Sequence, residues 1–359
     1  MARALYVHIP FCQSICAYCD FPKVLYRQNW AESYLSALFA ELDSYNIGKA
    51  STIYVGGGTP SALPAPLLKK LLEKLSPLLE KGGEFTVEAN PESLSEEKIA
   101  LLKEGGVNRV SLGVESSIPR YLTLMNRKHT FEEARKAVEN LRKAGISNIN
   151  ADWIYALPGE TVEEVREEAK AFLSLGLPHL SAYTLILEDG SLFKVKGVKE
   201  ASEDEQGEQY EEVLSLLRDA GYQRYEVSNF AKPGFQSRHN LTYWRDEEYY
   251  GIGLGASGYL DGMRYTNTCS LSLYIKGKGL REKEEPSGEE EFLLSRLRLE
   301  EGFALTTFEK RFGKDFLLAY QTSLKKMEKE GLLVLGEGRI KPTDRGIECL
   351  DYVLLSLLS

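Results

Sequence analysis

The sequence predicts an α/β protein, a partial, open, TIM-like (βα)6 barrel followed by a C-terminal winged-helix-like α+β module. Six short runs of β-branched and aromatic residues alternate with amphipathic stretches over the first 230 residues. Six units fall short of the eight that close a complete barrel, so we expect an opening on one side. The last ~70 residues combine helical patterns with one short hairpin, which predicts the module.

The barrel elements follow one another along the chain. The expected strands are residues 4–9, 51–58, 84–89, 109–114, 148–157 and 179–187, with a further short run at 224–230. The expected helices are residues 30–45, 65–79, 95–106, 130–145, 161–176 and 204–221. Thr130 and Glu133 have the spacing of a capping box, which starts the fourth helix. Strand–helix–strand crossovers are right-handed and produce a parallel sheet, so this alternation predicts a barrel at residues 1–230.

The composition changes after Phe230. Residues 232–267 are rich in Gly and Tyr without a clear period, which favours an irregular functional wrap, and the charged residues 276–291 indicate a surface connection. We therefore expect a wrap and linker at residues 231–284 and a module at 285–359. A hairpin around Gly336–Gly338 between helices is typical of a winged helix. Such a module binds DNA or serves as a packing or protein-contact unit, and the absence of an Arg-rich recognition helix favours the second interpretation.

Composition limits the partners. The 359 residues are 43% hydrophobic, which allows a sizeable core, and the net charge is −9. Nucleic acid and anionic lipid both attract a basic surface, so we expect neither as a direct partner. No apolar run approaches the ~20 residues of a membrane span, and the N-terminal apolar stretch is too short for a signal peptide. We expect a cytoplasmic protein.

Three of the five cysteines lie close together, Cys12, Cys16 and Cys19, directly after the first strand. Three thiolates at this spacing can ligate three irons of a 4Fe–4S cluster and leave the fourth iron open for a substrate or cofactor. The alternatives are three inert buried thiols, which a loop after a strand disfavours, and a structural zinc site. Zinc requires four ligands, and only His8 lies nearby. The other cysteines, Cys269 and Cys349, lie outside any ligand spacing, and Cys349 is expected in the core.

Polar residues follow several of the expected strands. Residues 56–60 read Gly-Gly-Gly-Thr-Pro, which is no P-loop because no Gly-Lys-Ser/Thr follows. Each carboxylate at a strand end is by itself more often a solvated loop residue or helix cap. However, three on successive strands can line one cavity at the face where barrel enzymes build their sites. These residues are Glu88, Glu115 and Asp152, and Arg127 joins them.

The Cys-x-x-x-Cys-x-x-Cys pattern, with Tyr18 before the last cysteine, resembles the signature of the radical S-adenosylmethionine superfamily. The resemblance implies a 4Fe–4S cluster on the three cysteines and S-adenosylmethionine at the open iron. It implies that the glycine run binds the methionine amino group, Arg127 the carboxylate and Asp152 the ribose hydroxyls. The cofactor contacts that it implies are Tyr6, Tyr18, Gly57, Gly58, Thr59, Glu88, Glu115, Arg127 and Asp152.

Four longer motifs, YVHIPFC, GGGTP, EANPE and HNLTYW, resemble the coproporphyrinogen dehydrogenase-like group. Its oxygen-independent coproporphyrinogen oxidases carry a further cysteine where this chain has Phe21. HemW-type haem chaperones have Phe there and an H-N-x-x-Y-W block like residues 239–244. Resemblance to that branch implies a protein that binds haem b and delivers it to haem-requiring respiratory proteins, with membrane contact only through the recipient. Glu115 stands where these relatives commonly have Gln.

Two interpretations therefore remain. The first is a haem chaperone, and the alternative is an enzyme for the radical oxidative decarboxylation of coproporphyrinogen III to protoporphyrinogen IX. His239 is a candidate axial haem ligand, although its block could instead only order the segment that closes the barrel. Cys269 is an alternative haem ligand, and His8 is expected to be structural.

Overall fold

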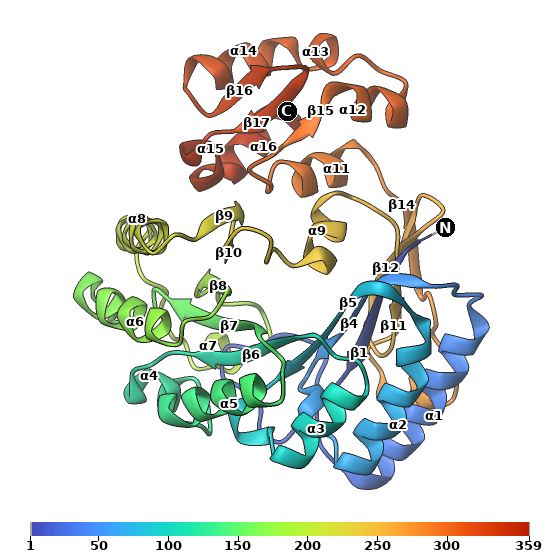
Figure 1. Ribbon diagram of the computed structural model, residues 1–359. Coiled ribbons are helices and arrows are strands. Elements are labelled where there is room, and N and C mark those ends of the chain that lie inside the picture. Colours follow the sequence, from blue (N-terminus) through green and yellow to red (C-terminus); the bar gives the residue numbers. More distant parts are fainter. Residues whose placement is uncertain (1, 359) are drawn as a thin grey trace.

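The computed structural model describes residues 2–358, and a twelve-stranded sheet runs through it (Figure 1). The strand order is β14-β13-β12-β11-β1-β4-β5-β6-β7-β8-β10-β9, so the two edges, β14 and β9, do not pair with each other. Six parallel strands form its centre: β1 (Ala4–Ile9), β4 (Ala50–Gly57), β5 (Leu79–Ala89), β6 (Arg109–Glu115), β7 (Asn148–Tyr155) and β8 (His179–Thr184). The expected open (βα)6 barrel is confirmed.

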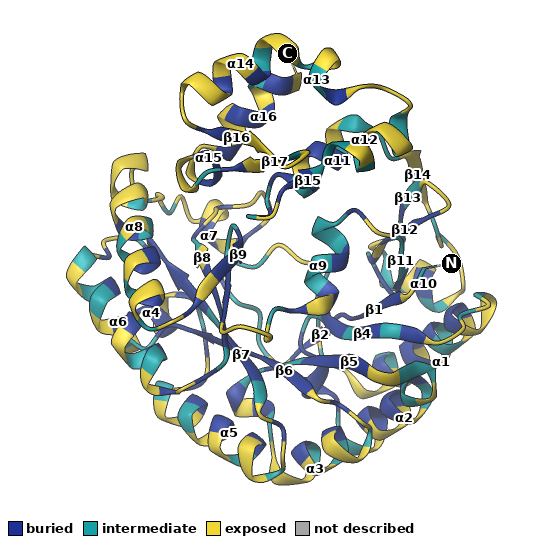
Figure 2. Ribbon diagram, turned by 45° about the horizontal axis from the view of Figure 1, so that its top comes forward, coloured by how far each residue is buried: buried dark blue, intermediate teal, exposed yellow. Residues whose placement is uncertain are grey.

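Helices follow these strands and cover the outer face of the sheet (Figures 1 and 2). They are α1 (Gln28–Ser44), α2 (Ala65–Leu75), α3 (Glu96–Glu104), α5 (Phe131–Lys143), α6 (Val162–Ser174) and α8 (Glu203–Asp219), with the short α4 (Pro119–Leu124) and α7 (Leu192–Val195) between them. The capping box of Thr130 and Glu133 starts α5 as predicted. No helix within residues 2–358 is long and apolar enough to cross a membrane.

The central strands separate an apolar outer face from a polar inner face. On β6, Val110 and Leu112 pack under the helices, whereas Arg109 and Ser111 line a cavity. On β7, Ile149 and Ala151 likewise belong to the core, whereas Asn150 and Asp152, which alternate with them, line the cavity. A closed (βα)8 barrel fills its interior with branched apolar side chains. This barrel instead keeps a polar interior that can receive a ligand.

The stretch expected as an irregular wrap forms regular structure, so that prediction was wrong. β11 (Tyr249–Ile252) pairs parallel with β1, and β12 (Ser257–Leu260), β13 (Met263–Thr266) and β14 (Lys283–Pro286) continue the sheet antiparallel. At the other edge β10 (Asn229–Ala231) and β9 (Gln223–Glu226) extend β8. The strands are too short to show alternation, and a Cβ at Gly258 would fall 2.2 Å from the Tyr265 ring, so glycine interrupts the apolar pattern. Two helices, α9 (Arg238–Trp244) and α10 (Leu271–Ile275), lie in the same stretch.

The C-terminal module has its own core and a three-stranded sheet, β15 (Phe303–Ala304), β17 (Arg339–Pro342) and β16 (Leu333–Gly336). Its helices are α11 (Glu289–Arg296), α12 (Leu305–Phe312), α13 (Phe316–Ala319), α14 (Gln321–Lys329), α15 (Asp344–Glu348) and α16 (Leu350–Leu358). The hairpin expected around Gly336–Gly338 joins β16 and β17. Cys349, expected in the core, is exposed because the last helical pattern breaks there into α15 and α16.

Candidate functional site

The cysteine loop connects the end of β1 to α1 at the carboxyl edge of the parallel strands. Cys12 ends the short β2 (Phe11–Cys12), which pairs with β3 (Val24–Leu25), and Cys16 and Cys19 follow in turns. The Ala17 amide donates to the Met125 carbonyl at 2.9 Å, which ties the loop to the barrel. All three cysteines line one cavity of about 390 Å³, a volume in the range of small-molecule sites.

The cysteines fit an iron–sulfur cluster better than a single metal ion. Within residues 2–358 no three His, Cys, Asp or Glu side chains are close enough to hold one ion. A cluster binds one cysteine at each of three irons and so tolerates wider spacing. Burial raises the pKa of the Cys12 thiol to about 12 and raises that of Cys19, so the positive charge of bound metal is required to keep them as thiolates.

The glycine run crosses the cavity wall beside the cysteines. Gly57 has a φ of +113°, which side-chain-bearing residues rarely adopt, and its amide donates to Glu88 Oε2 at 3.0 Å. A Cβ on Gly58 would lie 3.0 Å from Cys12 Sγ. Thr59, which follows, donates weakly to the same sulfur at 3.9 Å. Glycine here lets the end of β4 pack closely against His8, Pro10 and Cys12, where a Cβ would clash.

Glu88 lies near the end of β5, the strand next to β4, and so borders the glycine run. Its Oε1 accepts a hydrogen bond of 2.7 Å from the Tyr54 hydroxyl. Burial raises the pKa of the Glu88 carboxyl to about 7, so ligand-free protein holds it partly protonated near neutral pH. A cationic ligand group at this position would favour the carboxylate, as the ammonium of an amino acid does.

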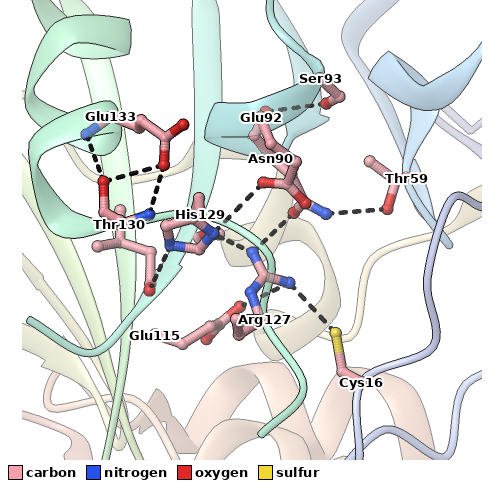
Figure 3. A network of polar contacts seen from close by, with 12 residues as sticks. Cys16, Thr59, Asn90, Glu92, Ser93, Glu115, Arg127, His129, Thr130 and Glu133 are labelled. Atoms are coloured by element: carbon pink, nitrogen blue, oxygen red, sulfur yellow. Dashed lines mark hydrogen bonds and ion pairs between the residues drawn. The ribbon is translucent and has the colours of Figure 1, made fainter. Parts of the chain in front are cut away.

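Arg127 lies at the centre of a polar network that joins the cysteine loop to β6 (Figure 3). Its Nη1 lies 3.3 Å from Cys16 Sγ and 3.8 Å from Glu115 Oε1, and its Nη2 donates to Asn90 Oδ1 at 3.0 Å and to the Gly113 carbonyl. Burial opposes the charge of Arg127, but Tyr18, Glu115 and Cys16 hold its pKa above the usual value. Burial raises the pKa of the Glu115 carboxyl to about 7 despite the nearby guanidinium. The network places a fixed cation next to the cysteine loop.

Asp152, on β7, lines the cavity together with the carboxylates of Glu88 and Glu115. Its carboxylate accepts hydrogen bonds from Asn150 Nδ2 at 2.8 Å and from the Ser111 hydroxyl at 3.4 Å. Burial raises its pKa. Tyr18 lines the same cavity, but Tyr6 does not; its hydroxyl instead pairs with His8 Nδ1 at 2.9 Å. His8 Nε2 in turn pairs with the Pro22 carbonyl, so His8 links β1 to the segment that follows the cysteine loop.

His239 is not brought into the cavity. It lies in α9, fully buried, where Nδ1 pairs with Thr52 Oγ1 at 2.8 Å and Nε2 with the Tyr243 hydroxyl at 2.6 Å. Its amide donates to Glu84, so α9 covers the amino-terminal end of β4 and β5, opposite the cysteine loop. Burial lowers the pKa of the imidazole to about 3, which keeps the ring neutral. Cys269 is exposed and does not line this cavity either.

The structure adds lining residues that sequence reasoning missed: Tyr54, Asn90, Arg109, Ser111, Asn150, Ser181 and Tyr183. Most of them occupy alternate positions of the central strands. Polar residues at every second position of otherwise apolar strands were the available signal, because one face of such a strand must point away from the core.

Comparison with known proteins first identifies the class. The profile of the Radical SAM superfamily matches residues 6–172, and that of the HemN C-terminal domain matches residues 290–348. A solved structure, the coproporphyrinogen III oxidase HemN of Escherichia coli, has the same fold with a TM-score of 0.85 at 22% identity over 99% of this chain and 89% of that chain. The fold and the cysteine loop therefore define a protein with a radical SAM domain.

The particular family follows from closer relatives. The heme chaperone HemW of Lactococcus lactis is 44% identical over 99% of this chain and 97% of its own length. That of Bacillus subtilis is 36% identical over 96% of both chains. This chain belongs to the family of proteins named heme chaperone HemW.

Proposed function

We propose that this protein is a cytoplasmic haem chaperone that binds haem b, a 4Fe–4S cluster and S-adenosylmethionine, and that delivers haem to haem-requiring respiratory proteins. One observation carries the proposal. Three cysteines share one cavity with the glycine run, the carboxylates of Glu88, Glu115 and Asp152, and two buried arginines. The acidic chain favours neither nucleic acid nor direct membrane binding, so membrane contact would come through the recipient.

Cys12, Cys16 and Cys19 would hold the cluster, whose open iron supplies a binding position for S-adenosylmethionine. The Arg127 guanidinium is preorganised to donate to a carboxylate. Glu88 would accept from the amino group once its carboxyl has lost a proton, next to the amides of Gly57 and Gly58. Asp152 would accept from ribose hydroxyls, with Asn150 holding its orientation. Tyr18 and Thr59 would close the wall beside the sulfurs.

Apolar side chains at the cavity support haem as the cargo. Phe21 is 60% exposed, Ile186 64% and Tyr183 39%, and all three line the cavity. Exposed apolar groups that border a polar cavity suit a flat apolar macrocycle with anionic edges. His239 serves this proposal as a positioning residue for α9, since ligation would require it to give up a hydrogen bond to Thr52 or Tyr243.

Phe21 also weighs against the enzymatic alternative. It occupies the position two residues after Cys19 where the coproporphyrinogen oxidases that this chain resembles carry a cysteine. A phenyl ring can contact a porphyrin but supplies no ligand or redox group.

The test is an anaerobic titration. Full-length protein with reconstituted cluster is titrated with haem, and the same preparation is assayed for conversion of coproporphyrinogen III with S-adenosylmethionine and a reductant. We expect stoichiometric haem binding without product. Cys16→Ser should lose the cluster absorbance, whereas Cys349→Ser, an exposed cysteine outside the loop, should keep it. Formation of protoporphyrinogen with 5′-deoxyadenosine would assign the protein to the enzymes instead.

A further inference from the structure

Three arginines are buried within residues 2–358, and two of them are neutralised by the protein. Arg127 bonds to the network described above, and Arg224 pairs with Glu300 and Asp344. The side chain of Arg109, with 1% of the residue's surface exposed, forms no hydrogen bond or ion pair to any residue in this range, and its buried Nε has no partner. A guanidinium stays charged in proteins, so it requires an anion from elsewhere.

Two other buried polar groups without partners lie next to Arg109 in the sheet. In the sheet register its neighbours are Thr86 on β5 and Asn148 on β7. The Thr86 hydroxyl and the Asn148 amide oxygen are also buried without a partner. Three adjacent strands thus carry unsatisfied polar groups in one row, whereas buried polar groups in folded proteins are nearly always paired.

Of this row, Arg109 lines the same cavity as the cysteines, but at its far end. Arg109 lines the cavity from the first position of β6, and Glu115, beside the cysteine loop, is the last. Six residue steps along a strand span about 20 Å. A ligand carboxylate bound next to the cluster is therefore within reach of Arg127 and not of Arg109. The cavity offers a second, separate cationic position.

The chemistry of this position fits a carboxylate. A guanidinium donates two parallel hydrogen bonds to a carboxylate, and Ser111 and Asn150 line the cavity two residues further along their strands. His179 and His239 cannot compete as cations, since burial first, and then the charge of Arg109, lowers the pKa of each. Asp152 shares the cavity, where burial raises its pKa and the charge of Arg109 partly offsets that rise, but its carboxylate forms hydrogen bonds to Asn150 and Ser111 and no ion pair with Arg109.

We propose that Arg109 is the anchor for a carboxylate of the cargo, a propionate of haem, at the floor of the cavity. The inference rests on the proposed function, because it names the group by which that cargo is held. It assigns the two cationic positions to two ligands, Arg127 to S-adenosylmethionine and Arg109 to haem.

The test compares haem with haem dimethyl ester, whose propionates carry no charge, on reconstituted full-length protein. Wild type should bind haem about 10- to 100-fold more tightly than the ester, the range expected for a buried charge-assisted pair. Arg109→Met should reduce haem affinity to the level of the ester and leave the ester and S-adenosylmethionine affinities unchanged. Arg109→Lys, which keeps the charge and loses the fork, should retain part of the preference.

A ligand-free measurement separates anchoring from a structural role. Arg109→Met removes an unpaired buried charge, so its melting temperature should equal or exceed that of wild type. Arg224→Met is the matched control, a buried arginine with protein partners, and its melting temperature should fall. An equal fall in both variants would overturn the proposal.

The binding measurements distinguish a failure of the Arg109 anchor from a failure of the proposed chaperone function. If wild type binds haem and Arg109→Met keeps the preference for haem over the ester, Arg109 is not the anchor and the chaperone function stands. If Arg109→Met weakens S-adenosylmethionine and not haem, the carboxylate belongs to the cofactor and the proposal is wrong. If wild type binds no haem, the proposed function fails and the inference fails with it.

Discussion

Gly58 leaves no room for a side chain, and the cost of adding one can be worked out from its contacts. The Cβ of Gly58→Ala would fall 2.7 Å from the Pro10 carbonyl carbon and 3.0 Å from Cys12 Sγ. Carbon atoms pack at about 3.5 Å, so the two segments must separate by about 0.8 Å. Two hydrogen bonds hold them together, from the Gly58 amide to Ile9 at 2.8 Å and from the Thr59 amide to Phe11 at 2.9 Å.

Such a separation stretches both bonds beyond the usual range and moves Cys12 with its loop. We expect Gly58→Ala to lower the free energy of unfolding of ligand-free protein by about 2–3 kcal/mol, the size of a tight overpacking. We also expect less iron per protein after anaerobic reconstitution. The assays are urea unfolding and iron analysis of the purified variant.

The control is Gly207→Ala, in the middle of α8, where a Cβ would meet nothing within 4 Å. It should stabilise the protein by about 0.5–1 kcal/mol and leave the iron content unchanged. A Gly58→Ala protein with wild-type stability and full iron content would refute the reasoning that close approach of the glycine run fixes the cysteine loop.

Three further predictions concern other buried groups. Burial, and then the neighbouring Glu168, raise the pKa of Glu160 to about 9, so the folded protein retains a proton that the unfolded chain releases above its ordinary value of 4.5. Stability should therefore fall as pH rises from about 4.5 to about 9, and Glu160→Gln should flatten that slope in urea melts; equal slopes in variant and wild type would contradict this. Arg224→Met should cost about 1–3 kcal/mol, because it removes charge-assisted hydrogen bonds to the partly exposed carboxylates of Glu300 and Asp344, and limited proteolysis should then separate the C-terminal module from the barrel. Resistance of that variant equal to wild type would show that the pair does not secure the module. His239→Ala should lower stability by about 1–3 kcal/mol through its lost hydrogen bonds, yet leave the Soret band of the haem complex in place; a shifted band would identify His239 as a ligand after all.

Local sequence patterns were sufficient to predict much of the barrel. The six parallel strands are long enough to show alternation, and α5 begins at the capping box of Thr130, so both could be predicted from neighbouring residues. The cysteine spacing likewise predicted one shared position for three thiols, because a single short loop carries them. The strands β11 to β14, which extend the sheet beyond β1, could not be recognised. They have four residues each, and Gly251 and Gly258 interrupt the apolar pattern because the neighbouring strand lies against them.

The sequence by itself determined the open barrel and the three-cysteine loop, since each depends on patterns within single βα units. Only the tertiary structure decided which side chains share the cavity. In the structure His239 lies at the end of the barrel opposite the cysteine loop, where Thr52, Glu84 and Tyr243 satisfy its polar groups. It also showed Arg109 to be a buried cation without a partner, because pairing across three strands depends on register, which no local pattern specifies.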